Sequence, residues 1–190
     1  MRVVGGRHRG RRLVAPPGET VRPTSDRARE ALFNILSHGD FAAAGSPFAE
    51  ENVLDAFAGT GAFGIEALSR GAARAAFIET DRAALRALRQ NLAALDEEDA
   101  ADVISGDAIR PPRAPFACAL AFLDPPYRSG LAAPALIALG GMGWLAPRTI
   151  AVVEIAADEA FSLPDGFTLT DERKYGAAKL VFLRREGGKK

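Results

Sequence analysis

Apolar runs of strand length alternate with helix-like segments between residue 52 and about residue 155, and this alternation restricts the possible folds more than any other feature. Helical spacing is clearest in residues 81–95, where the leucines are Leu85, Leu88, Leu92 and Leu95. Strands that alternate with helices predict a parallel sheet, because each crossover needs a helix that packs back onto the sheet. We therefore expect an α/β fold with a mostly parallel sheet and helices on both faces.

The segments expected to form elements can be given by number. We expect strands at 52–58, 73–79, 102–105, 116–123 and 149–155, and helices after the glycines of 59–64 up to residue 70, at 81–95 and at 131–139. The stretches 2–4 and 11–14 predict an N-terminal hairpin, and 167–175 with 178–184 a closing hairpin. Thr24 or Ser25 can cap a helix that ends near Leu36, and 39–47 is predicted to be a loop. We divide the chain into a basic arm (1–20), expected to be a mobile hairpin, and one domain (21–190).

The composition excludes several classes of protein. One cysteine and two histidines cannot form a Cys/His zinc site, and we expect no metal. The N-terminus has no apolar signal core, and no apolar run is long enough to span a bilayer. Cys118 lies in an apolar run and is predicted to be a buried hydrophobic residue rather than a nucleophile. We expect a soluble, monomeric, cytoplasmic protein.

Charge is distributed unevenly, although the net charge is zero. Residues 1–29 hold eight arginines and two acidic residues, so this segment carries +6 and the remainder −6. A basic segment on an acidic body favours an anionic partner such as RNA, and a solvated basic tail is the alternative. The candidate phosphate-binding residues are Arg7, Arg9, Arg11, Arg12 and Arg22.

A glycine-rich turn follows the first strand of the alternating region. Gly59, Gly61 and Gly64 have the spacing of a dinucleotide-binding loop, and Glu79 ends the next strand 20 residues after Gly59. A carboxylate at that place can accept hydrogen bonds from ribose hydroxyls. The loop by itself fits either NAD or S-adenosylmethionine (SAM), and a purely structural turn is a third possibility.

Asp55 favours SAM. A carboxylate just before the glycine turn repels a pyrophosphate, whereas it attracts the cationic methionine part of SAM. Asp107 follows the third strand and can accept from the adenine amine, although a turn or cap aspartate is equally consistent with its position. The candidate cofactor residues from this region are Asp55, Phe57, Gly59, Gly61, Glu79 and Asp107.

Asp124-Pro125-Pro126-Tyr127 directly follows the apolar run 116–123, at the strand end where ligands bind in open parallel sheets. The two prolines stiffen the loop and provide no N–H donors. Asp124 and nearby carbonyls can therefore accept hydrogen bonds from an exocyclic base amine, and Tyr127 can stack on the base. Such contacts orient the nitrogen for methyl transfer, and Asp124 can take its proton. An ordinary turn is the alternative.

These motifs, in this order, resemble the class I SAM-dependent amino-methyltransferases. Three further segments are similar to the bacterial 16S ribosomal RNA guanine-N2 methyltransferase family (RsmD-like): the basic start 1–13, the segment 22–36 beginning Arg-Pro-Thr, and the closing 175–182. The resemblance implies the Rossmann-like class I methyltransferase fold with seven strands, SAM as cofactor, and a guanine N2 target in small-subunit rRNA or an assembling 30S subunit. It also implies that Thr24 lies over the cofactor and that Glu79 and Asp107 bind its ribose and adenine.

Three other functions remain open. An NAD-dependent oxidoreductase would use the glycine turn but leave residues 124–127 without a role. A non-catalytic RNA-binding protein would have no use for Asp55, Glu79 and Asp124. An enzyme of the same class could act on adenine in DNA or RNA, or on a protein glutamine, and residue types alone do not separate these targets.

Overall fold

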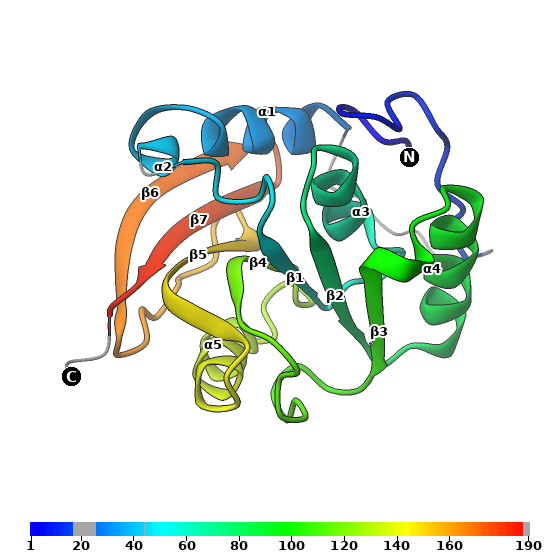
Figure 1. Cartoon of the computed structure of the whole chain (residues 1–190). Coiled ribbons are helices and arrows are strands. Elements are labelled where there is room, and N and C mark those ends of the chain that lie inside the picture. Colours follow the sequence, from blue (N-terminus) through cyan, green and yellow to red (C-terminus); the bar gives the residue numbers. More distant parts are fainter. Residues whose placement is uncertain (17–25, 44, 188–190) are drawn as a thin grey trace.

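A single seven-stranded sheet organises the molecule. The computed structural model describes residues 1–16, 26–43 and 45–187. Strand order is β3-β2-β1-β4-β5-β7-β6, and the first five strands along the chain are parallel (Figure 1). β7 is antiparallel to both β5 and β6, so the chain closes with a hairpin. The strands are β1 (Asn52–Ala56), β2 (Arg74–Glu79), β3 (Ala101–Ser105), β4 (Cys118–Leu123), β5 (Leu145–Ala156), β6 (Phe167–Tyr175) and β7 (Ala178–Arg185).

Helices cover both faces of this sheet. In Figure 1, α1, α3 and α4 lie on one face and α5 lies on the other. Each face has its own apolar core because successive strand residues point to opposite sides: Val53 belongs to one buried cluster and Leu54 to the other. The helices are α1 (Asp26–Leu36), the one-turn α2 (Gly39–Ala42), α3 (Ala62–Ser69), α4 (Arg82–Ala94), the 3₁₀ turn η1 (Glu98–Ala100) and α5 (Ala132–Gly141).

Most elements expected from the sequence are present. The stretches 2–4 and 11–14 form only the isolated bridge between Arg2 and Arg12, the expected strand 116–123 begins at Cys118, and the 3₁₀ turn η1 was not expected. The segment 39–47 contains the short helix α2 rather than loop alone. β5 begins at Leu145, four residues before the expected start, because Leu145 already pairs with Cys118. The register then shifts between Cys118 and Leu120, and Arg148 has a positive φ of 69°. An irregular strand of this kind lacks the regular alternation of apolar and polar residues that identifies a strand in the sequence. Pro147, which is unusual inside a strand, also argues against an earlier start.

The N-terminal hairpin packs on the domain and does not form the mobile arm expected from the sequence. Arg2 and Arg12 form an antiparallel bridge. Val3 and Leu13 are buried and belong to the same core as α1, α3 and α4. Because apolar side chains of the hairpin complete that core, residues 1–13 are part of the domain. The boundary expected near residue 20 lies outside the described residues, as do the expected caps Thr24 and Ser25.

Cys118 is fully buried in β4, as expected, and burial raises the pKa of its thiol to about 12. In the described part of the chain, no helix has the length and apolar character needed to span a bilayer. The same residues contain no group of three or more His, Cys, Asp or Glu side chains placed to hold a metal ion.

Candidate active site

Three acidic side chains gather where the central parallel strands end. Ala56 pairs with Ile78 on one side and with Leu123 on the other. Glu79 and Asp124, each next in sequence to one of those partners, therefore lie on either side of the turn that follows β1. Asp55 lies one residue earlier, inside β1. The sheet topology thus brings together the carboxylates that the sequence singled out.

The glycine turn between β1 and α3 needs its glycines for two reasons. Gly59 and Gly61 have positive φ values of 53° and 81°. Residues with a side chain rarely adopt such values. A Cβ on Gly61 would lie 2.3 Å from the side chain of Leu88, and one on Gly64 would lie 2.3 Å from the ring of Phe77. The turn therefore packs tightly against helix α4, which carries Leu88, and strand β2, which carries Phe77. Phe57 also has a positive φ, 59°, which marks local strain at the start of the turn.

Asp55 is buried directly beneath this turn. Its carboxylate accepts a hydrogen bond of 2.9 Å from the backbone N–H of Gly64, in the first turn of α3. Burial raises the pKa of Asp55 from 3.8 to about 7, and the negative charge of Glu79 adds to the shift, although the backbone hydrogen bonds oppose it. A cation beside Asp55 would favour the ionised form that burial disfavours.

Glu79 is held by backbone N–H groups at the edge of a small cavity. One carboxylate oxygen accepts from Gly59 at 2.7 Å, and the other accepts from Thr80 and Asp81 at 2.7 Å each. The cavity has a volume of about 210 Å³. Four of the lining residues are predicted site residues, and most of the others are apolar. The lining is Phe57, Ile78, Glu79, Thr80, Gly106, Asp107, Ala108, Pro126 and Leu131. Asp107 also accepts from the N–H of Ile109 at 3.0 Å, so it shapes its own turn.

Asp124 begins the loop after β4 and is partly buried. Its N–H bonds to the carbonyl of Ala56 at 3.3 Å, which ties the loop to β1. Burial raises the pKa of Asp124 well above its usual value, and the negative charges of Glu154 and Asp55 raise it further. Pro125 is buried and Pro126 is exposed.

Tyr127 is anchored by a residue that the sequence did not single out. Its hydroxyl donates a hydrogen bond of 2.9 Å to Glu154, which lies on β5 and is only 3% exposed. The available sequence signal was a lone carboxylate inside the apolar run 150–156. A buried carboxylate in such a strand needs a partner, and the partner became visible only once β4 and β5 were paired.

The predicted RNA-binding arginines fall into three groups. Arg7 forms an ion pair with the buried Glu97 at 2.5 Å, and Arg11 donates to the carbonyl of Ala94 at 2.7 Å. Arg9 and Arg12 are exposed on the hairpin. Arg22 lies outside the described residues, as does the predicted cofactor residue Thr24.

Known proteins share both the sequence and the fold. A family model described as conserved hypothetical protein 95 matches residues 1–184. Ribosomal RNA small subunit methyltransferase D of Escherichia coli K12 is 36% identical over 187 residues, covering 98% of this chain and 90% of that protein. The Haemophilus influenzae protein of the same name is 35% identical, covering 93% of this chain and 89% of that protein. The chain belongs to this methyltransferase family.

Solved structures agree with the family assignment. The Escherichia coli chain yhhF matches with a TM-score of 0.82 at 36% identity, and 99% of each chain is covered. An RNA methyltransferase from Salinibacter ruber, solved in complex with S-adenosyl-L-homocysteine, matches with a TM-score of 0.64 at 14% identity, covering 86% of this chain and 94% of that one. The second likeness concerns the fold alone. Together they place this member of the family among proteins with the class I methyltransferase architecture.

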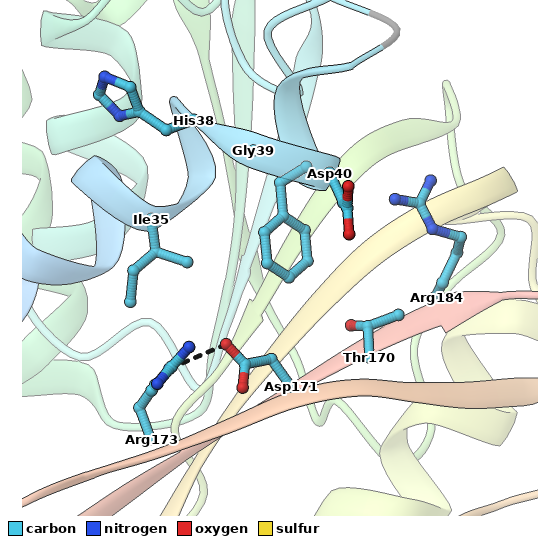
Figure 2. A pocket seen from close by; sticks show the side chains of 9 residues that line it. Ile35, His38, Gly39, Asp40, Thr170, Asp171, Arg173 and Arg184 are labelled. Carbon is cyan, nitrogen blue, oxygen red and sulfur yellow. Dashed lines mark hydrogen bonds and ion pairs between the residues drawn. The ribbon is translucent and has the colours of Figure 1, made fainter.

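A larger hollow of about 540 Å³ lies elsewhere in this family member, between α1 with α2 and the closing hairpin (Figure 2). It mixes apolar groups with charges of both signs, and its lining is Ile35, His38, Gly39, Asp40, Phe41, Thr170, Asp171, Arg173 and Arg184. None of the predicted site residues that the structure describes lines it. The smaller cavity beside Glu79 is therefore the better candidate for the cofactor.

Proposed function

We propose that this protein is a SAM-dependent methyltransferase that methylates the exocyclic N2 amine of a guanine in small-subunit (16S) ribosomal RNA, in the cytoplasm. One observation carries the proposal: Asp124-Pro125-Pro126-Tyr127 lies beside the cavity that Glu79 and Asp107 line, and Pro126 forms part of both. The names of the relatives support the choice of rRNA and of the small subunit.

The residues around the cavity suit SAM. Glu79 would accept hydrogen bonds from the ribose hydroxyls and Asp107 from the adenine amine, while Phe57 contributes apolar surface. Gly59 and Gly61 let the backbone approach the ligand closely. Burial disfavours the ionised form of Asp55. The sulfonium or the ammonium of a bound SAM would offset this effect and favour the ionised carboxylate. The Arg-Pro-Thr segment with Thr24 would cover this ligand.

SAM supplies an activated methyl group when it is bound. The protein's own residues then have to hold the amine and remove its proton. Asp124 accepts a hydrogen bond from the guanine N2 amine, and the proline backbone beside it offers no competing donor. Burial and the neighbouring negative charges raise the pKa of Asp124, and a carboxylate with a raised pKa is a better proton acceptor than an ordinary aspartate, so Asp124 can take the proton that the amine loses. Tyr127, fixed by Glu154, would stack on the base.

The N-terminal hairpin would contribute to RNA binding through Arg9 and Arg12, because these two exposed guanidinium groups can reach phosphates. Arg7 and Arg11 have partners within the protein and would contribute less. Arg22 would act closer to the cofactor. The partner is then small-subunit rRNA, free or in an assembling 30S subunit.

Two measurements test this function. Isothermal calorimetry should show binding of SAM and of its demethylated product, and no binding of NAD. Mass spectrometry of nucleosides from rRNA, with and without the gene, should show one N2-methylguanosine that depends on the gene. Dependence of N6-methyladenosine instead would point to an adenine target, and NAD binding without SAM binding would refute the methyltransferase assignment.

A further inference from the structure

Three arginines of α4 form a single stripe on its surface. Arg82, Arg86 and Arg89 are all exposed and are spaced by four and three residues, which places them on one side of the helix. They line a hollow of about 280 Å³ together with Leu85 and Ser105. Ser105 ends β3, the edge strand of the sheet. The arginine stripe therefore lies along the junction of α4 and the sheet edge.

In the part of the chain that the structure describes, none of the three guanidinium groups has a hydrogen bond or ion pair with another residue. Other arginines of the molecule are neutralised: Arg74 pairs with Asp102 and Arg128 with Asp158. Like charges at i and i+4 destabilise a helix slightly, so the stripe opposes helix formation. Three unpaired arginines on one helix face are typical of a surface that binds an anionic partner, whose negative charges neutralise them.

The stripe begins close to the candidate active site. Ser105 pairs in register with Glu79, and Gly106 donates its N–H to the carbonyl of Glu79 at 3.0 Å. Gly106 also lines the cofactor cavity. From β3 to β4, which Asp124 directly follows, there are three strand spacings, or roughly 14 Å. An RNA strand of a few nucleotides spans that distance.

The N-terminal hairpin packs against the side of α4 opposite the arginine stripe. Asn91 exchanges two hydrogen bonds with the backbone of Val14, at 2.7 and 3.1 Å. Asn91 is nine residues after Arg82, which is about two and a half helical turns. The arginine stripe and the hairpin thus present two separate basic surfaces on either side of one helix.

We propose that the stripe formed by Arg82, Arg86 and Arg89 is a docking surface for the phosphate backbone of the RNA substrate. Guanidinium groups bind phosphate oxygens in bidentate fashion, and three on one helix face can follow a strand without reading its bases. The stripe positions the RNA, while the loop that begins at Asp124 contacts the target base. This inference rests on the proposed function.

The test uses the double variant Arg86→Gln/Arg89→Gln, which leaves Arg82 in place because it directly follows Asp81, the N-cap of α4. Arg113→Gln/Arg148→Gln is the matched control, since both arginines are exposed, Arg113 precedes β4, and Arg148 lies in the irregular first part of β5, at the other end of the parallel strands. Binding of a 16S rRNA fragment is followed by fluorescence anisotropy from 50 to 300 mM KCl. SAM affinity, melting temperature and methyl transfer are measured in parallel.

The stripe variant should bind the fragment roughly tenfold to a hundredfold more weakly near 0.1 M salt, and the slope of log affinity against log salt should fall by about two. The KM for RNA should rise, while SAM affinity and melting temperature stay at wild-type values. The control should match wild type in every measurement.

RNA affinity and salt slope equal to wild type in the stripe variant would overturn the docking surface, even if methyl transfer is confirmed. An equal loss in the control would also overturn it, because it would show a general effect of charge. Wild-type protein that binds the fragment through the stripe but transfers no methyl group would support the surface and refute the proposed function.

Discussion

The hydroxyl of Tyr127 donates a 2.9 Å hydrogen bond to Glu154, which joins the loop after β4 to the C-terminal part of β5. Burial raises the pKa of Asp124, and the negative charge of the same Glu154 carboxylate raises it further. Glu154 therefore acts on both ends of the Asp-Pro-Pro-Tyr loop: it fixes the ring at one end and favours the protonated carboxyl at the other. A buried acid on a neighbouring strand thus contributes to both the geometry and the charge of the candidate catalytic loop.

Tyr127→Phe should lower kcat/KM for RNA by about threefold to tenfold, because it removes one hydrogen bond and keeps the ring. Tyr127→Ala should cost more, since it also removes the stacking surface. SAM affinity should stay unchanged in both variants. Steady-state kinetics on rRNA check this, and equal activity of the alanine variant and wild type would show that the ring is not used.

Asp124→Ala should reduce methyl transfer on the order of 10²–10³-fold, because it removes the acceptor for the target amine. SAM affinity, measured by calorimetry, should remain close to that of wild type. In the wild-type enzyme, kcat should rise with pH, because the raised pKa keeps Asp124 protonated in acidic solution and only the ionised form accepts a proton. Wild-type turnover in the alanine variant would exclude Asp124 from the chemistry.

Asp55 should make the folded protein less stable as pH rises from about 4 to 7. Its pKa of about 7 in the folded state lies above 3.8, so between these values the unfolded chain releases a proton that the folded chain retains. The free energy of unfolding should fall over this window by as much as about 4 kcal/mol.

Asp55→Asn keeps a side-chain oxygen that can accept the hydrogen bond from the N–H of Gly64, but the asparagine side chain cannot ionise. Urea denaturation of both proteins at a series of pH values should therefore give a shallower fall for the variant, with Asp124 accounting for part of what remains. Identical pH profiles would mean that Asp55 is not the titrating group.

Arg7→Gln should lower the free energy of unfolding by about 1–2 kcal/mol, because Glu97 is buried and loses its guanidinium partner. Arg12→Gln, on the exposed side of the same hairpin, should leave stability unchanged and weaken RNA binding. Urea midpoints and RNA anisotropy separate the two effects. If Arg7→Gln weakens RNA binding at unchanged stability, the hairpin arginine contacts RNA and its pair with Glu97 is secondary.

Local patterns predicted most of the fold. The glycine turn, the apolar run before Asp124 and the leucine spacing of α4 each depend on residues adjacent in sequence, and each formed the expected element. β5 and α2 were placed less well. The start of β5 is irregular and contains Pro147, and α2 is a single turn, so neither gives a periodic signal.

The sequence by itself determined that carboxylates would follow consecutive parallel strands, since strand ends and their acidic residues can be identified along the chain. Only the tertiary structure decided what each charge contacts. The pairing of β4 with β5 places Glu154 within hydrogen-bonding distance of Tyr127. The packing of the N-terminal hairpin on the domain forms the ion pair between Arg7 and Glu97. The three arginines of the α4 stripe, in contrast, remain exposed. The physical reason is that periodicity reports which face of an element is buried, whereas the partner of a charge depends on elements that meet only after folding.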